Sequence, residues 1–134
     1  MNAPAPIAVF TATIGSVDDG TVVVSVPGNA YRITMAWGGV DTPSPGRVKG
    51  VIEAHALRVH KAAAGGRFIE PVMGVPRIVS GTVEAIDEDA ATVALHSVVP
   101  MHVALEDRED LAKCTLGSLV NFHVRSDVRF SPAG

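Results

Sequence analysis

The sequence predicts an all-β protein made of two copies of one small unit, and three observations lead to this fold class. Residues 10–18 align with residues 79–87 at an offset of 69. Six positions within 46–59 align with positions within 117–130 at an offset of 71. In both copies apolar and polar side chains alternate with the period of two that is typical of half-buried strands. An internal repeat decides the architecture, so the duplication is the leading feature of the chain.

The first copy contains five predicted strands separated by turns. The first begins near residues 7–10, and the five cover about 10–16, 22–26, 31–37, 47–53 and 56–60. Asp18, Asp19 and Gly20 predict a hairpin turn, because Asp and Gly tolerate positive φ angles, and 27–29 predicts a second turn. Two prolines and two glycines make residues 38–45 a loop.

The second copy repeats this order. Its predicted strands are 78–86, 92–96, 101–105, 119–124 and 127–130, and positions 31, 33 and 35 align with 101, 103 and 105 at an offset of 70. Residues 106–114 predict a short helix, with acidic side chains in its first turn and Lys113 near its end, which suits the helix dipole. Three strands, a loop or helix and two more strands match the chain order of a five-stranded, mostly antiparallel OB-like barrel.

We therefore expect a tandem repeat of two OB-like barrels. The predicted organisation is an N-terminal arm (1–7), a first barrel (8–60), an ordered connector (61–77) and a second barrel (78–131). The predicted core consists of Phe10, Ile14, Ile33, Met35, Val48 and Val51, with Val79, Val83, Val103, Leu105, Leu119 and Phe122 as their counterparts. Tyr31 and Trp37 share the apolar face of their strand and are expected in the core as well.

Composition favours self-association over binding to nucleic acid or membrane. The net charge is −3 without a basic cluster, and aromatic residues make up 4% of the chain, which argues against a nucleic-acid partner. Hydrophobic residues make up 47%, yet no apolar run approaches the ~20 residues of a membrane-spanning helix. This apolar surplus predicts a homo-oligomer. The single Cys114 and the absence of a signal-peptide pattern predict a cytoplasmic protein, with Cys114 as a small buried side chain.

No catalytic residues, metal ligands or cofactors are predicted. Glu53 and His55 face the same way on a strand, and His96 and His102 flank a turn, but neither pair has the three or four convergent ligands of a zinc site. The Asp and Glu pairs in the hairpin turns lack the pocket that general acid–base catalysis needs. The chain is therefore not expected to be an enzyme.

The connector supplies the first candidate binding residues. Arg67, Glu70 and Arg77 lie in a segment that also holds Phe68, Ile69, Val72 and Met73. The three charged side chains form either a structural ion-pair cluster or a site at which the two arginines grip a small anion. The four large apolar side chains predict that the connector is ordered and that it takes part in assembly.

The second copy resembles the molybdate-binding Mop domains, small OB-like barrels that also occur in tandem. The resemblance rests on residues 81–86 (GTVEAI) and 116–120 (LGSLV), and on Arg125 and Ser126, which stand where that family often carries a Lys-Ala-Ser-like stretch. It implies a small oxyanion held between subunits, with Arg125 and Ser126 among its ligands. We thus expect a non-catalytic binding or assembly module first, a molybdate-like oxyanion-binding protein second, and a single-stranded nucleic-acid-binding OB protein third.

Overall fold

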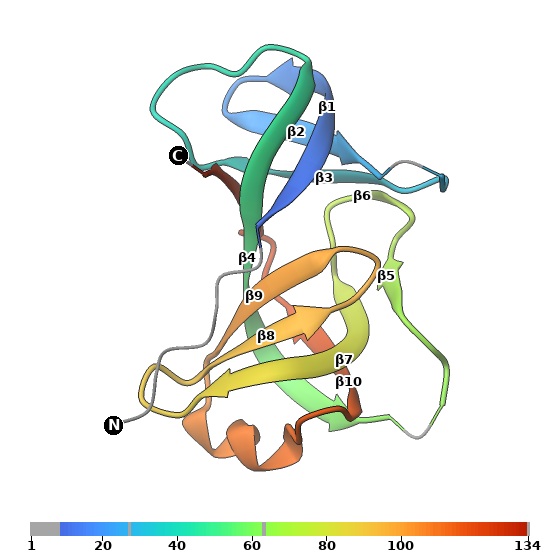
Figure 1. Ribbon diagram of the computed structural model, residues 1–134, viewed down its shortest axis with the longest axis vertical. Coiled ribbons are helices and arrows are strands. Elements are labelled where there is room, and N and C mark those ends of the chain that lie inside the picture. Colours follow the sequence, from blue (N-terminus) through green and yellow to red (C-terminus); the bar gives the residue numbers. More distant parts are fainter. Residues whose placement is uncertain (1–8, 27, 63, 134) are drawn as a thin grey trace.

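The computed structural model describes residues 9–26, 28–62 and 64–133. The protein is predominantly β: these residues form one mixed sheet of eleven strands with a single short helix. The predicted arm 1–7 and Pro27 of the second predicted turn lie outside the described residues. Figure 1 shows two groups of strands, one above the other, joined by the long strand β4.

The first group pairs in a closed order. Its strands are β1 (Phe10–Asp18), β2 (Thr21–Ser25), β3 (Arg32–Trp37) and the first half of β4 (Gly46–Lys61). The β1–β2 and β2–β3 pairs are antiparallel, and β1 also pairs with β4. Asp19 and Gly20 have positive φ angles, as the predicted hairpin turn requires.

The second group has the same pairing order. It contains β7 (Ile78–Asp87), β8 (Thr92–His96), β9 (Pro100–Leu105) and β10 (Leu119–Val124). The β7–β8 and β8–β9 pairs are antiparallel, and β7 also pairs with β10. The register shift between Ile14 and Ser16 in β1 recurs between Val83 and Ala85 in β7, which are the positions that the repeat aligns.

The last strand of each half belongs to the sheet of the other half. The predicted fourth and fifth strands of the first copy are one continuous strand, β4, whose C-terminal part lies between β9 and β10. The C-terminal strand β11 (Arg129–Pro132) returns to the first half and lies between β3 and β4. In Figure 1 this dark-red strand leaves the lower group and reaches the upper one. The pairings thus run β1–β2–β3–β11–β4–β1 and β7–β8–β9–β4–β10–β7.

The predicted core is largely correct, and Val51 and Leu119 depart from it. Ile14, Ile33, Met35, Val79, Val83, Val103, Leu105 and Phe122 are buried, and Phe10, Val48, Tyr31 and Trp37 are partly buried against the core. The prediction that Val51 is buried is wrong, because Ile52 points inward and Val51 lies on the opposite face of β4. Leu119 is only half-buried. A shift of one residue moves every side chain of a strand to the other face, and adjacent apolar residues at 51 and 52 leave that choice open.

The registers also correct the sequence offsets of the third, fourth and fifth strands. Val22 pairs with Met35 and the aligned Val93 pairs with Val103, so Met35 corresponds to Val103 rather than to Leu105. The shift is two residues, which preserves the buried face. In the fourth strand the correspondence moves by one residue, and this explains the misplaced Val51.

The connector is ordered against both halves. Its strand β5 (Phe68–Glu70) pairs with β7, and its strand β6 (Met73–Gly74) pairs with β3 in the upper group. Ile69 is buried and its backbone N–H donates to the Tyr31 hydroxyl at 3.3 Å. Residues 68–74 therefore bridge the two groups of strands.

The predicted helix between the third and fourth strands of the second copy is a six-residue 3₁₀ helix, η1 (Arg108–Lys113). Asp107 caps it by accepting a hydrogen bond from the Glu109 N–H, and the acidic first turn and Lys113 lie as expected. Its C-cap, Cys114, is buried as predicted.

Candidate functional site

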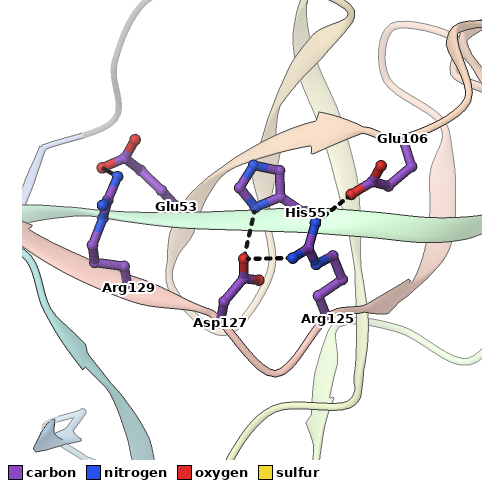
Figure 2. Close-up of polar contacts among 6 residues, drawn as sticks. All are labelled: Glu53, His55, Glu106, Arg125, Asp127 and Arg129. Atoms are coloured by element: carbon purple, nitrogen blue, oxygen red, sulfur yellow. Dashed lines mark hydrogen bonds and ion pairs between the residues drawn. The ribbon is translucent and has the colours of Figure 1, made fainter.

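A cluster of six charged or titratable side chains lies where the chain crosses between the two halves. Glu53 and His55 come from the middle of β4, Glu106 follows β9, Arg125 and Asp127 lie between β10 and β11, and Arg129 begins β11. Figure 2 shows these side chains facing one another along β4. The strand exchange itself assembles the cluster, because it brings the β10–β11 link across the centre of β4.

Arg125 is the centre of one part of this cluster. Its Nη1 donates to Glu106 Oε1 at 2.7 Å and its Nη2 lies 3.5 Å from Asp127 Oδ2. The hydrogen bond to Glu106 and the nearby charge of Asp127 raise the pKa of Arg125 above its ordinary value. His55 Nδ1 lies 3.5 Å from the same Asp127 oxygen. The backbone N–H of Arg125 donates to the backbone carbonyl of His55. The cluster thus ties the β10–β11 link to β4.

Glu53 is the centre of the other part. Its Oε1 accepts a hydrogen bond from the Ser131 hydroxyl at 3.0 Å and lies 3.6 Å from Arg129 Nη2. Both partners belong to β11, so these contacts hold the exchanged strand against β4. Each carboxylate of the cluster faces an arginine, an arrangement suited to fastening strands.

Two depressions adjoin Glu53. One, of about 350 Å³, is lined by Val9, Val51, Glu53, His102, Ser131, Pro132 and Ala133. The other, of about 210 Å³, is lined by Ala36, Glu53, His55, Asp127 and Arg129. His102 stands opposite Glu53 in the β4–β9 register, and its buried Nε2 has no hydrogen-bond partner among the described residues. The volume of the first depression lies at the lower end of the range of small-molecule sites, and its walls are mostly apolar.

The candidate residues of the connector do not form one cluster. Arg67 donates from Nε to the Thr82 hydroxyl at 3.3 Å. Glu70 and Arg77 are exposed and line a surface depression of about 360 Å³ with Pro71 and Ile78, while the Arg77 N–H donates to the Glu70 carbonyl. No ion pair joins Arg67, Glu70 and Arg77 within the part of the chain that the structure describes.

Arg125 and Ser126, the residues carried by the Mop resemblance, lie in the β10–β11 link, and both are exposed. The two carboxylates beside Arg125 occupy the guanidinium that an oxyanion would use. Sequence reasoning missed the other five members of the cluster as a group. The only signal was the spacing of Glu53 and His55 on one strand.

Outside the junction cluster, His96 and Cys114 have contacts of their own. His96 Nδ1 lies 2.9 Å from Glu84 Oε1. No three His, Cys, Asp or Glu side chains converge on a possible metal position in residues 9–26, 28–62 and 64–133. Burial raises the pKa of the Cys114 thiol, and the charge of Asp110 raises it further, so the reactive thiolate is disfavoured.

Comparisons with protein families, curated proteins and solved structures returned no match for this chain. Among the described residues, none of the helical structure is long and apolar enough to cross a membrane.

Proposed function

We propose that each half is a small OB-like barrel completed by the last strand of the other half, and that the protein is a non-catalytic assembly module. The closed pairing orders of the two halves support the barrels. In each order the fifth strand lies between the third and the fourth, and it is parallel to the third, as β11 is to β3 and β4 is to β9. This is a Greek-key arrangement of the OB kind.

The observation that carries the assembly function is the exposed apolar surface of the connector. Three apolar side chains within four consecutive residues are exposed: Val72 by 45%, Met73 by 69% and Val75 by 39%. Their backbone is held in place, since the Arg32 N–H donates to the Val72 carbonyl at 2.9 Å and β6 pairs with β3. An ordered segment that presents adjacent apolar side chains to solvent marks an interaction surface.

The charges beside this surface favour its binding to the same surface of a second copy of the chain. Glu70 and Arg77 flank the three apolar residues and are exposed, without an ion-pair partner among the described residues. In a two-fold contact the same patch meets itself, so Glu70 of one copy can lie against Arg77 of the other, in both directions. One negative and one positive charge on either side of an apolar strip are self-complementary.

Pairing between strand edges is a weaker route to assembly. The closed orders give β1 to β4 and β7 to β11 neighbours on both sides over part of their lengths, whereas β5 and β6 are only three and two residues long. Short edges bind added strands poorly. Side chains of the connector therefore provide the contact.

Light scattering coupled to size exclusion, over a range of concentrations, tests this proposal. We expect a dimer that Val72→Ser/Met73→Ser converts to a monomer, because burying each such side chain stabilises a contact by ~1.5–3 kcal/mol. Leu116→Ser is the matched control, since Leu116 is 63% exposed in the loop before β10. Glu70→Arg should also dissociate the dimer, and Glu70→Arg/Arg77→Glu should restore it. A wild-type monomer at all concentrations, or a dimer that survives the connector variants, would contradict the proposal.

Oxyanion binding is the second candidate, through Arg77, which is exposed and makes no ion pair within residues 9–26, 28–62 and 64–133. The same samples, melted with and without molybdate, tungstate, sulfate and phosphate, separate it from assembly. A ligand at 100 times its dissociation constant stabilises by ~2.7 kcal/mol. Stabilisation that Arg77→Gln removes, in a protein that stays monomeric, would favour the oxyanion over the dimer.

A further inference from the structure

The outer face of the β4–β10 pair carries two histidines and an asparagine that the junction cluster does not use. His60 of β4 stands directly opposite Asn121 of β10, and His123 lies two residues further along β10 on the same face. The imidazole rings of His60 and His123 have centroids 5.4 Å apart and are inclined by 71°. The side-chain amide oxygen of Asn121, Oδ1, is buried and accepts no hydrogen bond from any described residue.

From this arrangement we propose that His60, Asn121 and His123 form a binding site for a borderline transition-metal ion such as Zn²⁺ or Cu²⁺. Imidazole binds such ions with a metal–nitrogen distance of ~2.0–2.1 Å, so two rings on one ion have centroids roughly 4.5–6 Å apart. The observed separation falls in this range. An ion there would give the Asn121 oxygen the electrostatic partner that it lacks, and a buried polar group without a partner is costly.

The ligand set selects the class of ion. Two neutral imidazole nitrogens and one amide oxygen favour Zn²⁺, Ni²⁺ or Cu²⁺ over Mg²⁺ or Ca²⁺, which prefer several oxygen ligands. Three protein ligands leave further coordination positions to solvent, and His60 is exposed, so an ion has access. Arg58 is paired with His123 in the register and shares this face. Its positive charge opposes any cation, which provides a test of position.

Isothermal titration of the full chain with ZnCl₂ is the primary experiment. We expect one site whose affinity falls by more than about tenfold in His60→Ala, a loss typical even for groups that only support a ligand. His96→Ala is the matched control, because it removes a histidine that lies elsewhere and is paired with Glu84, and it should leave the affinity unchanged. Asn121→Asp and Arg58→Gln should both raise the affinity, since each makes the site less positive.

Copper identifies the ligands directly. Cu²⁺ bound to the wild type should show an electron paramagnetic resonance spectrum with two imidazole nitrogens, and Cu²⁺ bound to His123→Ala should show one. The circular dichroism melt of each variant without metal checks its fold, and His60→Ala alone carries the test if His123→Ala unfolds. No Zn²⁺ binding by the wild type, or equal affinity of His60→Ala and His96→Ala, would overturn the site.

Discussion

The two halves receive their exchanged strands at the same place but with side chains of very different size. In the first half, Phe130 of β11 lies opposite Ile52 of β4 and beside Trp37 of β3. In the second half that place belongs to Ala56 of β4, opposite Val124 and beside Leu105. Both residues are buried, so a ring in one half is replaced by a single methyl group in the other.

The difference reflects how each half closes its end between the third and fourth strands. The first half stacks Trp37 on Phe130, with ring centroids 5.9 Å apart, and the Trp37 indole N–H donates to the Asp41 carbonyl of the 38–45 loop. The second half uses η1, which contacts β4 and β9 and packs Leu111 against the core. The Glu106 N–H donates to the Ala56 carbonyl where the chain enters this helix. Aromatic rings in the first half and a helix in the second half therefore close the same end of two similar strand arrangements.

The largest expected effect comes from removing the ring. Phe130→Ala should lower the free energy of unfolding by ~3–5 kcal/mol, because Phe130 is fully buried and contacts both Trp37 and Phe10. Val59→Ala, in the part of β4 that the second half receives, should cost clearly less. Urea denaturation followed by circular dichroism measures both. Equal losses would mean that the two halves do not depend on different devices.

A smaller effect should distinguish the first strands of the two halves. Ala12 in β1 and Gly81 in β7 occupy aligned positions. A Cβ at Gly81 would lie 2.6 Å from the His96 carbonyl oxygen and 2.9 Å from Leu95 Cγ, so Gly81→Ala should destabilise by ~1–3 kcal/mol through overpacking.

Ala12→Gly is the reciprocal change and should cost about 1 kcal/mol, from added chain entropy and the lost methyl group. The same urea titration compares the two variants. If Gly81→Ala were neutral, the β7–β8 pair would have room that its registers do not indicate, and the two hairpins would be equivalent.

Local pattern predicted the strands better than their partners. The alternation from Phe10 to Ser16 and the Asp19–Gly20 turn specify the first hairpin because neighbours in sequence make it. The exchange of last strands depends instead on pairings between distant segments, such as that of Phe130 with Ile52. Alternation records which face of a strand is apolar, and it carries no information about which strand lies beside it.

The candidate site was less predictable for the same reason. Arg125 was singled out by a resemblance, but its partner Glu106 lies in a different segment. His60 and His123 become neighbours only because β4 crosses into the second half and pairs with β10. Arg129 likewise lies between Ala36 of β3 and Glu53 of β4, whereas Arg58 lies opposite His123 of β10.

Those two arginines give the smallest and most discriminating prediction. The sequence aligns Arg58 with Arg129, yet Arg129 lies 3.6 Å from Glu53, and Arg58 makes no ion pair among the described residues. Arg129→Ala should therefore lower the free energy of unfolding by up to about 1 kcal/mol, as expected for a half-exposed pair, and Arg58→Ala should change it very little. Repeating the denaturation in 1 M NaCl should remove most of the Arg129 effect, because the screening length falls to about 3 Å. A loss that persists in high salt would assign the role of Arg129 to the packing of its aliphatic stem, and equal losses for both arginines would show that the junction charges do not hold β11 in place.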